Sequence, residues 1–247
     1  ASPYQPAMSR IPTVVSIGDG IIDAVELTPG AIERFPGGAA LNLAVGVARL
    51  GLRSRFVTRF GLDREGFLLE RTLRQEGVEI LNPPNVDFTG VVLSTRDDGE
   101  PTYHFTPPMF RRRSFFTEAV RAAIAGADAV VVNSFPFDVP VQADALVSAF
   151  TEARGQVVVD PNPRANLIRD VPAYRAGAEK AVAVARMVKL SDEDIALLYG
   201  ESPDAVTARM FGLGAALVLL THGSRGARLL TRDGLDVGVP IATGEVA

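Results

Sequence analysis

FPGGAALNLAVGVARLG occupies residues 35–51, and its two halves have different local character. Gly37 and Gly38 end a short loop, and glycine lets a backbone approach a ligand closely because it carries no Cβ. Apolar residues then recur at helical spacing as far as Gly51, a residue type that commonly follows the last turn of a helix. Asn42 falls in the first turn of this predicted helix, where its amide can face the same space as the glycine N–H groups. The stretch predicts either a ligand-binding element or a plain loop-to-helix junction, because short glycine motifs are weak evidence by themselves.

The composition is that of an ordinary globular protein and excludes several functional classes. Hydrophobic residues make up 47% and charged residues 22% of the 247 residues, which suffices for one large core. The lack of cysteine excludes disulfides and thiolate metal sites and fits a cytoplasmic protein. With 25 basic against 29 acidic residues, and no apolar run long enough to cross a bilayer, the sequence indicates neither a nucleic-acid nor a membrane partner.

The chain alternates strand-like and helix-like segments from residue 11 onward, and we expect residues 11–247 to form one domain. Continuous β-branched runs separated by helical patterns predict an α/β architecture of three layers, a mostly parallel central sheet with helices on both faces. Two regions, about 24–36 and 88–107, instead alternate apolar and polar residues, which is typical of hairpins with one exposed face. Residues 1–7 lack the features of a signal peptide, and because Met8 looks like the natural initiator we expect them to be a cloning remnant.

Carboxylates follow the first predicted strand, Thr13 to Ile17, which Gly18 closes. Asp19 and Asp23 lie just beyond the carboxyl end of this strand, and that edge of a parallel sheet is where ligands bind. Asp23 is therefore a candidate ligand-binding residue, with an ordinary turn aspartate as the alternative. Asp19 is a weaker candidate that could orient its neighbours.

Two polar segments follow later predicted strands. In the segment DPNPR, residues 160–164, Arg164 offers a planar fork to a phosphate or a carboxylate, although an exposed salt-bridge partner would look the same. Ser191 and Asp194 are hard oxygen donors of the kind that suits Mg²⁺. Ser191 followed by three acidic residues is equally a normal helix N-cap, and a direct metal contact is the weaker of the two interpretations.

A glycine-rich loop, THGSRGA, follows the last strong strand at residues 221–227. Backbone N–H groups that glycines leave free can bind phosphate oxygens, whereas a hairpin turn is the alternative interpretation. His222 has no metal-binding companions in the sequence, so we assign it no catalytic role. The arginine run at residues 111–113 is interpreted as a solvated face, although a phosphorylated substrate could use it.

Taken together, these segments resemble the signatures of the ribokinase-like (PfkB) carbohydrate kinases, closest to fructokinase-like and 2-keto-3-deoxygluconate-kinase-like members. The resemblance implies a ribokinase-like fold in which the two hairpin regions form a small β-lid over the sugar, with ATP and Mg²⁺ as cofactors and a possible homodimer through the lid. Related enzymes have Asn-x-x-Glu where this chain has Ser191 and Asp194. The resemblance implies a sugar site of Asp23, Gly37, Gly38, Asn42, Phe105 and Arg164, a nucleotide site of Lys189, Ser191, Thr221, Gly223, Ser224 and Gly226, and a metal contact through water at Asp194.

One family signature does not occur in the sequence. The resembled family has a Gly-Ala-Gly-Asp segment shortly after the region equivalent to residues 236–240, and its aspartate is the general base. No such segment is present. We therefore expect a C-terminal part of the fold, with the catalytic base, to lie beyond Ala247. Within the chain, the resemblance leaves Arg164 as an anion contact and no catalytic residue.

The leading hypothesis is an ATP-dependent sugar kinase that transfers the γ-phosphoryl group to a hydroxyl of a fructose-like sugar or a keto-sugar acid. The sugar remains open, because Arg164 suits a carboxylate as well as a phosphate. Alternatives are a catalytically silent sugar-binding or regulatory protein and a nucleoside kinase of the same fold. A dinucleotide-dependent oxidoreductase is not favoured, because no Gly-x-Gly-x-x-Gly follows the first strand.

Overall fold

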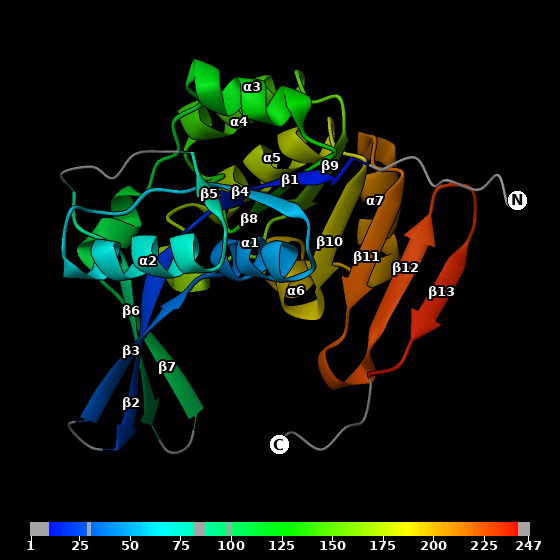
Figure 1. Ribbon diagram of the computed structural model, residues 1–247. Helices are drawn as coiled ribbons and strands as arrows, with labels where there is room; N and C mark the ends of the chain where they lie inside the picture. The colour runs from blue at the N-terminus through cyan, green and yellow to red at the C-terminus, as the bar shows by residue number, and fades with distance from the viewer. Residues whose placement is uncertain (1–9, 29–30, 82–86, 98–99, 242–247) are drawn as a thin grey trace, which may run out of the picture.

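The computed structural model describes residues 10–28, 31–81, 87–97 and 100–241 of the chain. The prediction about residues 1–7 therefore lies outside the described residues. Figure 1 shows a large central sheet with helices on both sides and a small second sheet that projects from it. This arrangement confirms the predicted α/β class with a mostly parallel central sheet flanked by helices.

The central sheet has nine strands within the described residues, in the order β13-β12-β11-β10-β9-β8-β1-β4-β5. Neighbouring strands from β11 to β5 are parallel, whereas β12 and β13 add an antiparallel hairpin at one edge. The strands are β1 (Thr13–Gly18), β4 (Arg53–Val57), β5 (Glu79–Ile80), β8 (Ala129–Asn133), β9 (Gln156–Asp160), β10 (Met187–Ser191), β11 (Leu217–Thr221), β12 (Ala227–Thr231) and β13 (Asp236–Val239).

The direction in which the sheet grows reverses at β1. This strand pairs with β4 on one side and with β8 on the other, so the chain builds the sheet toward β5 first and then returns past β1 to build the other half. In open α/β sheets, ligands bind beyond the carboxyl ends of the strands at such a reversal. The topology therefore predicts a ligand site at the loops that follow β1 and β8.

The helices form the two outer layers of the domain. Helices α3, α4 and α5 lie on one side of the sheet and α1 and α2 on the other (Figure 1). Polar side chains accept hydrogen bonds from the first turns of five helices, which is the usual way in which the free N–H groups of a helix end are satisfied. The helices are α1 (Ala39–Arg49), α2 (Arg64–Gln75), α3 (Glu118–Gly126), α4 (Pro140–Phe150), α5 (Val171–Val182), α6 (Asp192–Leu198) and α7 (Pro203–Leu213), with 3₁₀ turns at Pro107–Arg111, Ala165–Leu167 and Gly223–Arg225.

The hydrophobic core divides between the two faces of the sheet. Successive strand residues point to opposite faces, and accordingly Val57 packs in the cluster that contains α3 to α7, whereas its neighbour Phe56 packs in the cluster that contains α1 and α2. Both side chains are completely buried. Among the described residues, no helix combines the length and the apolar character that crossing a membrane requires.

The small sheet contains the two regions in which hairpins were predicted. Its strands are β2 (Ile21–Thr28), β3 (Ala31–Gly37), β6 (Val91–Asp97) and β7 (Glu100–Phe105), in the order β3-β2-β6-β7. Phe35, Asp23, Val92 and Phe105 are register partners across the four strands, so their side chains share one face of this sheet. We call this four-stranded sheet the lid.

The position of Asp23 differs from the sequence-based expectation. It lies inside strand β2, whereas the sequence placed it between the first strand and the hairpin region that begins at about 24, and Gly37 is the last residue of β3 rather than part of a loop. The physical reason is the alternation of Ile22 and Ala24, which are 0% and 2% exposed, with the polar Asp23 between them. This pattern of period two continues the strand toward the main core.

Candidate active site

The two adjacent glycines pack against aspartates of the protein itself. A Cβ on Gly37 would overlap the Asp23 carboxylate, and a Cβ on Gly38 would lie 2.5 Å from the Asp19 carbonyl oxygen. Gly38 has a φ of 100° and is the N-cap of α1, a conformation that side chains rarely tolerate. Burial raises the pKa of Asp23. The glycines thus bring both aspartates to the amino end of α1, where the helix dipole favours negative charge.

Asn42 and Phe105 occupy different parts of this region. The side chain of Asn42 is exposed, and its backbone N–H donates to the Gly38 carbonyl at 2.9 Å in the first turn of α1. Phe105 is half-buried at the end of β7, on the lid face that also carries Asp23. Asp23, Gly37, Gly38 and Asn42 therefore gather at one end of α1, and Phe105 shares the lid face with Asp23.

A cavity of about 230 Å³ opens where β1 and β8 end. The chain from Gly18 to Ile21 forms one wall, and Phe135 and Met109 contribute apolar surface. None of the six residues that the resemblance implies for the sugar lines this cavity, although Gly38 approaches the backbone of Asp19, which does. Its charged lining consists of four arginines and two aspartates, namely Arg59, Arg111, Arg112, Arg113, Asp19 and Asp87. We call it the arginine-lined cavity.

A nearly buried ion pair holds two of these residues. Arg112 Nη1 donates to Asp19 Oδ2 at 2.6 Å, and the two side chains are only 12% and 18% exposed. Burial raises the pKa of Asp19, and the charge and hydrogen bond of Arg112 oppose that rise. The interpretation of the arginine run as a solvated face is therefore wrong for Arg112, because Asp19 neutralises it. Arg111 and Arg113 are exposed as that interpretation required.

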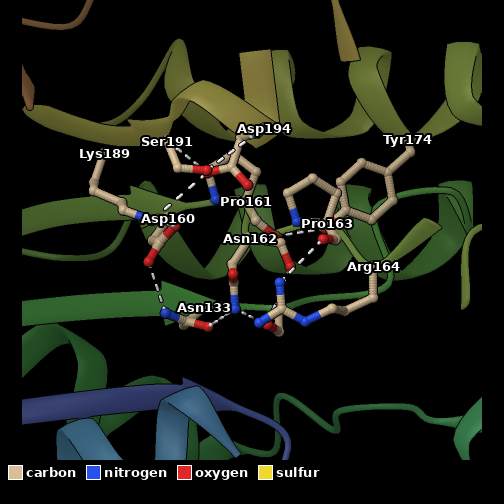
Figure 2. A network of polar contacts seen from close by, with 11 residues as sticks. Asn133, Asp160, Pro161, Asn162, Pro163, Arg164, Tyr174, Lys189, Ser191 and Asp194 are labelled. Carbon is tan, nitrogen blue, oxygen red and sulfur yellow. Dashed lines mark hydrogen bonds and ion pairs between the residues drawn. The ribbon is translucent and has the colours of Figure 1, made fainter. Parts of the chain in front are cut away.

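A network of polar side chains joins the loops after β8 and β9 (Figure 2). Asn133 Nδ2 donates to Asp160 Oδ2 at 2.8 Å, and Asn162 Nδ2 donates to Asn133 Oδ1 at 3.1 Å and to Ser134 Oγ at 2.6 Å. Ser134 and Asn162 have φ values of 52° and 39°, in the left-handed region that non-glycine residues rarely adopt. Such backbone persists where surrounding contacts enforce it, and it clusters at functional sites.

Lys189 lies between two carboxylates at the β10 side of this network (Figure 2). Its Nζ is 3.4 Å from Asp160 Oδ1 and 3.6 Å from Asp194 Oδ2. Burial raises the pKa of Asp160 to about 6, an effect that Lys189 opposes and Asp194 reinforces. Lys189 thus balances the negative charge of a mostly buried acidic pair.

Ser191 and Asp194 form the N-terminal capping box of α6. Asp194 N–H donates to Ser191 Oγ at 3.1 Å, and Ser191 N–H donates to Asp194 Oδ2 at 2.7 Å. The Asp194 side chain is 4% exposed, so its carboxylate does not fit as a direct Mg²⁺ ligand. Within the described ranges, no group of three or more His, Cys, Asp or Glu residues is arranged to hold a metal ion. Mg²⁺ that enters with a nucleotide keeps several waters and binds chiefly to phosphate oxygens, so it needs few protein ligands.

Arg164 follows β9 at the same edge but makes few contacts. It is exposed, and its Nη1 donates to the Pro163 carbonyl at 3.4 Å. Pro163 belongs to the turn that Tyr174 supports through a hydrogen bond from its hydroxyl to the Pro161 carbonyl at 2.6 Å. The guanidinium of Arg164 therefore remains available to an anion at this edge of the sheet.

A second cavity, of about 690 Å³, opens at the ends of β10 and β11. Its wall includes the loop after β11, where Gly223 and Gly226 have φ values of 54° and 95°. Lys189 is not part of its lining. Five of the six residues predicted for the nucleotide do line it, namely Ser191, Thr221, Gly223, Ser224 and Gly226. We call it the loop cavity.

Asp192 ties this loop to α6. Its carboxylate accepts from Arg225 Nη2 at 2.7 Å and lies 2.7 Å from His222 Nδ1. Burial alone would raise the pKa of Asp192, but the interactions with His222 and Arg225 prevail and hold it below its usual range. His222 therefore has a structural partner in Asp192.

Sequence reasoning missed two groups that the structure brings into the site. Asn133 directly follows the buried run 129–132, so the strand-end rule that selected Asp19 would also have selected it. Arg112 gave no such signal, because its partner Asp19 lies 93 residues earlier in the chain. Pairings of that kind depend on the fold and have no local pattern.

Comparisons with known proteins agree with this architecture. The sequence profile described as pfkB family carbohydrate kinase matches residues 12–245. The fructokinase of Klebsiella pneumoniae is 31% identical over 226 residues, which cover 87% of this chain and 73% of that protein. The crystal structure of fructokinase with bound ATP from Xylella fastidiosa matches with a TM-score of 0.82 at 25% identity, covering 95% of this chain and 75% of that one.

A further fructokinase structure supports the fold alone. The enzyme from Vibrio cholerae O395, in its fructose, ADP and calcium ion bound form, matches with a TM-score of 0.78 at 24% identity. The match covers 95% of this chain and 78% of that one. Because the family profile spans nearly the whole chain and the Klebsiella pneumoniae relative exceeds 30% identity, the chain belongs to the pfkB family of carbohydrate kinases.

Proposed function

We propose that the protein binds ATP and transfers its γ-phosphoryl group to a hydroxyl of a small carbohydrate, either a fructose-like sugar or a keto-sugar acid. The observation that carries this proposal is the order of features along the carboxyl edge of the sheet. The arginine-lined cavity lies at β1 and β8, the polar network at β8 to β10, and the loop cavity at β10 and β11. Phosphoryl transfer depends chiefly on holding the donor and the acceptor in position. A donor and an acceptor on either side of a rigid polar network would be held in this way.

On the acceptor side, we assign sugar contacts to the group at the amino end of α1. The Asp23 carboxylate can accept hydrogen bonds from sugar hydroxyls, and the exposed amide of Asn42 can both donate and accept. Gly37 and Gly38 keep the space next to these groups free of side chains. Phe105 contributes an apolar surface on the lid, and Arg164 is an anion contact at the end of β9.

On the donor side, we assign the nucleotide to the loop cavity. Thr221, Ser224 and the backbone N–H groups around Gly223 and Gly226 would bind its phosphates. Mg²⁺, when bound with ATP, neutralises charge on the transferred group. Asp194 would contact it only through water, because hydrogen bonds and burial occupy its carboxylate. We assign none of the described residues as the general base.

Two features of related proteins support this assignment. The Klebsiella pneumoniae relative is named a fructokinase, and the Xylella fastidiosa structure contains bound ATP. The loop cavity of this chain has the glycine-rich, hydroxyl-bearing lining that a nucleotide phosphate chain requires. The chemistry of this lining and the family both support an ATP site at that position.

The test is coupled ADP release by this chain with Mg·ATP and fructose, ribose, 2-keto-3-deoxygluconate or a nucleoside, together with the melting temperature in each ligand. We expect turnover or sugar-dependent stabilisation. Asp23→Asn should weaken the apparent affinity for the sugar at least tenfold in either measurement. Glu33→Gln, an exposed carboxylate on the neighbouring lid strand, is the matched control. Stabilisation without turnover is what a silent sugar-binding protein predicts. The absence of both turnover and stabilisation with every sugar tested would overturn the proposal.

A further inference from the structure

The arginine-lined cavity carries excess positive charge in an acidic protein. The chain has a formal net charge of −4, yet four arginines face two aspartates around this one cavity. A general basic surface cannot explain that concentration. The cavity also lies where the sheet reverses its direction of growth, which is the preferred ligand position in this architecture.

The carboxylates of the cavity neutralise only two of the arginines. Arg112 pairs with Asp19 at 2.6 Å, and Arg59 Nη2 lies 2.7 Å from Asp87 Oδ2. Among the described residues, no carboxylate lies within ion-pair distance of Arg111 or Arg113. These two guanidinium groups supply the uncompensated charge.

The segment that bears them is anchored on both sides. Before it, Arg169 Nη2 donates to the Phe110 carbonyl. After it, Ser114 N–H donates to Gln142 Oε1 at 2.7 Å, a contact buried in the domain. Arg112, between the two exposed arginines, is fixed by Asp19. Because the backbone is held at Phe110 and Ser114 and the side chain of Arg112 is held by Asp19, Arg111 and Arg113 project from a preorganised wall, which lowers the entropy cost of binding a ligand there.

We propose that this cavity selects a carbohydrate that bears an anionic group, a carboxylate or a phosphate ester, and that Arg111 and Arg113 bind that group. The inference rests on the proposed kinase function and deepens it. A guanidinium binds either anion through paired, charge-assisted hydrogen bonds, so the shared chemistry is a planar or tetrahedral oxyanion. The anionic group of the sugar is thereby assigned to the segment 111–113. Arg164, the anion contact that we assign at the end of β9, does not line this cavity.

The anionic group takes no part in the bond changes. A hydroxyl oxygen elsewhere on the same sugar bonds to the γ-phosphorus while the bond from that phosphorus to the bridging oxygen of ADP breaks, and the hydroxyl proton is released. The arginines therefore act through binding and orientation. Their contribution should appear as discrimination between charged and neutral sugars of the same skeleton.

The experiment compares kcat/KM for fructose, fructose 1-phosphate, fructose 6-phosphate and 2-keto-3-deoxygluconate in the unmodified chain and in Arg111→Gln, Arg113→Gln and the double variant. Arg154→Gln is the matched control, because Arg154 is exposed and precedes β9, at the opposite edge of the sheet. We expect an anionic sugar to exceed fructose, and the double variant to reduce that ratio at least tenfold. A preference for the keto-acid identifies a carboxylate, and a preference for one fructose phosphate identifies a phosphate ester.

The same ligands are tested for binding by melting temperature without ATP, so that failure of the kinase function can be told apart from failure of the inference. Stabilisation by an anionic sugar that is lost in the double variant and weakened by salt supports the inference even without ADP release. A preference for fructose over every anionic sugar would overturn it. So would a double variant in which the Michaelis constant for ATP rises while sugar discrimination is unchanged.

Discussion

The arginine-lined cavity and the loop cavity lie at the same edge of one sheet but offer negative charge very different surroundings. The first presents four guanidinium groups on side chains. The second is lined by Asp192, Glu193 and a glycine-rich loop, and its described lining includes no lysine or arginine. An anion in the loop cavity would depend on backbone N–H groups and on the metal ion that it brings, whereas an anion in the other cavity would meet positively charged side chains.

Under the proposed function, this difference separates the part of the site that binds the phosphoryl donor from the part that selects the acceptor. Backbone donors have positions that follow from loop conformation, so they suit a ligand that does not change. Side-chain donors can be replaced one at a time without altering the fold. We infer from this contrast that the arginine segment determines specificity for the sugar and that the glycine loop does not.

The largest effect is expected from Gly38→Ala, which would disrupt the packing of the amino end of α1 against Asp19 on the acceptor side. The new Cβ would meet the Asp19 carbonyl oxygen at 2.5 Å in a residue whose φ is 100°. Strain and overpacking together should lower the free energy of unfolding by about 3–4 kcal/mol. Urea unfolding measures the change.

Gly46→Ala is the matched control for that variant. Gly46 lies in the middle of the same helix, and an added Cβ would have nothing within 4 Å. We expect this substitution to stabilise the protein by about 1 kcal/mol, because alanine has the higher helix propensity. Equal effects of the two substitutions would contradict the close approach of Gly38 to Asp19.

A somewhat smaller effect is expected from Arg112→Met, which breaks the ion pair beneath the arginine-lined cavity. The substitution leaves the Asp19 carboxylate nearly buried without its partner, at a cost of roughly 3 kcal/mol. Adding Asp19→Asn to Arg112→Met should restore part of this loss, because it removes the uncompensated charge. A loss below about 0.5 kcal/mol, the range of an ordinary surface substitution, would show that the pair is not desolvated as the structure indicates.

The sequence predicted the α/β layers, and five of the six residues that it proposed for a nucleotide line one cavity, because these features have local patterns. Buried β-branched runs gave the strands, and the glycines at positions 223 and 226 marked the loop by themselves. Ser191 with Asp194 was recognisable as an N-cap, and the structure shows the full capping box.

The acceptor side was harder to predict, because its organisation depends on contacts between distant segments. The Asp19–Arg112 pair joins the end of β1 to a segment that begins only after the lid. The approach of Gly37 to the Asp23 carboxylate depends on the pairing of β2 with β3, and β2 includes Asp23, which the sequence placed just before the hairpin region. The contacts to which we attribute specificity thus lie where local patterns carry least information.

Asp160 lies between the two cavities, and its ionisation provides a third test. Its pKa of about 6 in the folded protein lies above the unfolded value of 3.8, since burial and Asp194 outweigh the opposing effects of Lys189 and Arg164. The folded state therefore holds this proton more tightly, so the associated stability is present at low pH and is lost as pH rises through 6.

Asp160→Asn removes this proton equilibrium while it keeps an oxygen that can accept from Asn133. Between roughly pH 4.5 and pH 7 the unfolding free energy of the unmodified protein should fall by about 2 kcal/mol relative to that of the variant. Urea titrations at several pH values give the comparison. Parallel pH profiles for the two proteins would mean that Asp160 titrates as an exposed carboxylate does.

The smallest effect is expected from Gly223→Ala, which addresses the loop cavity alone. Gly223 has a φ of 54° and open space where its Cβ would be, so the variant should lose only about 1 kcal/mol of stability. The added methyl group would enter the space that we assign to the nucleotide. The apparent affinity for Mg·ATP, measured from the stabilisation that it causes, should therefore fall about fivefold, while stabilisation by the preferred sugar is retained.

Gly234→Ala is the matched control, because Gly234 also has a positive φ and open surroundings but does not line the cavity. If both variants weaken nucleotide binding equally, backbone strain explains the result. If Gly223→Ala weakens sugar binding instead, the two cavities do not divide donor from acceptor, and the contrast between main-chain and side-chain recognition no longer holds.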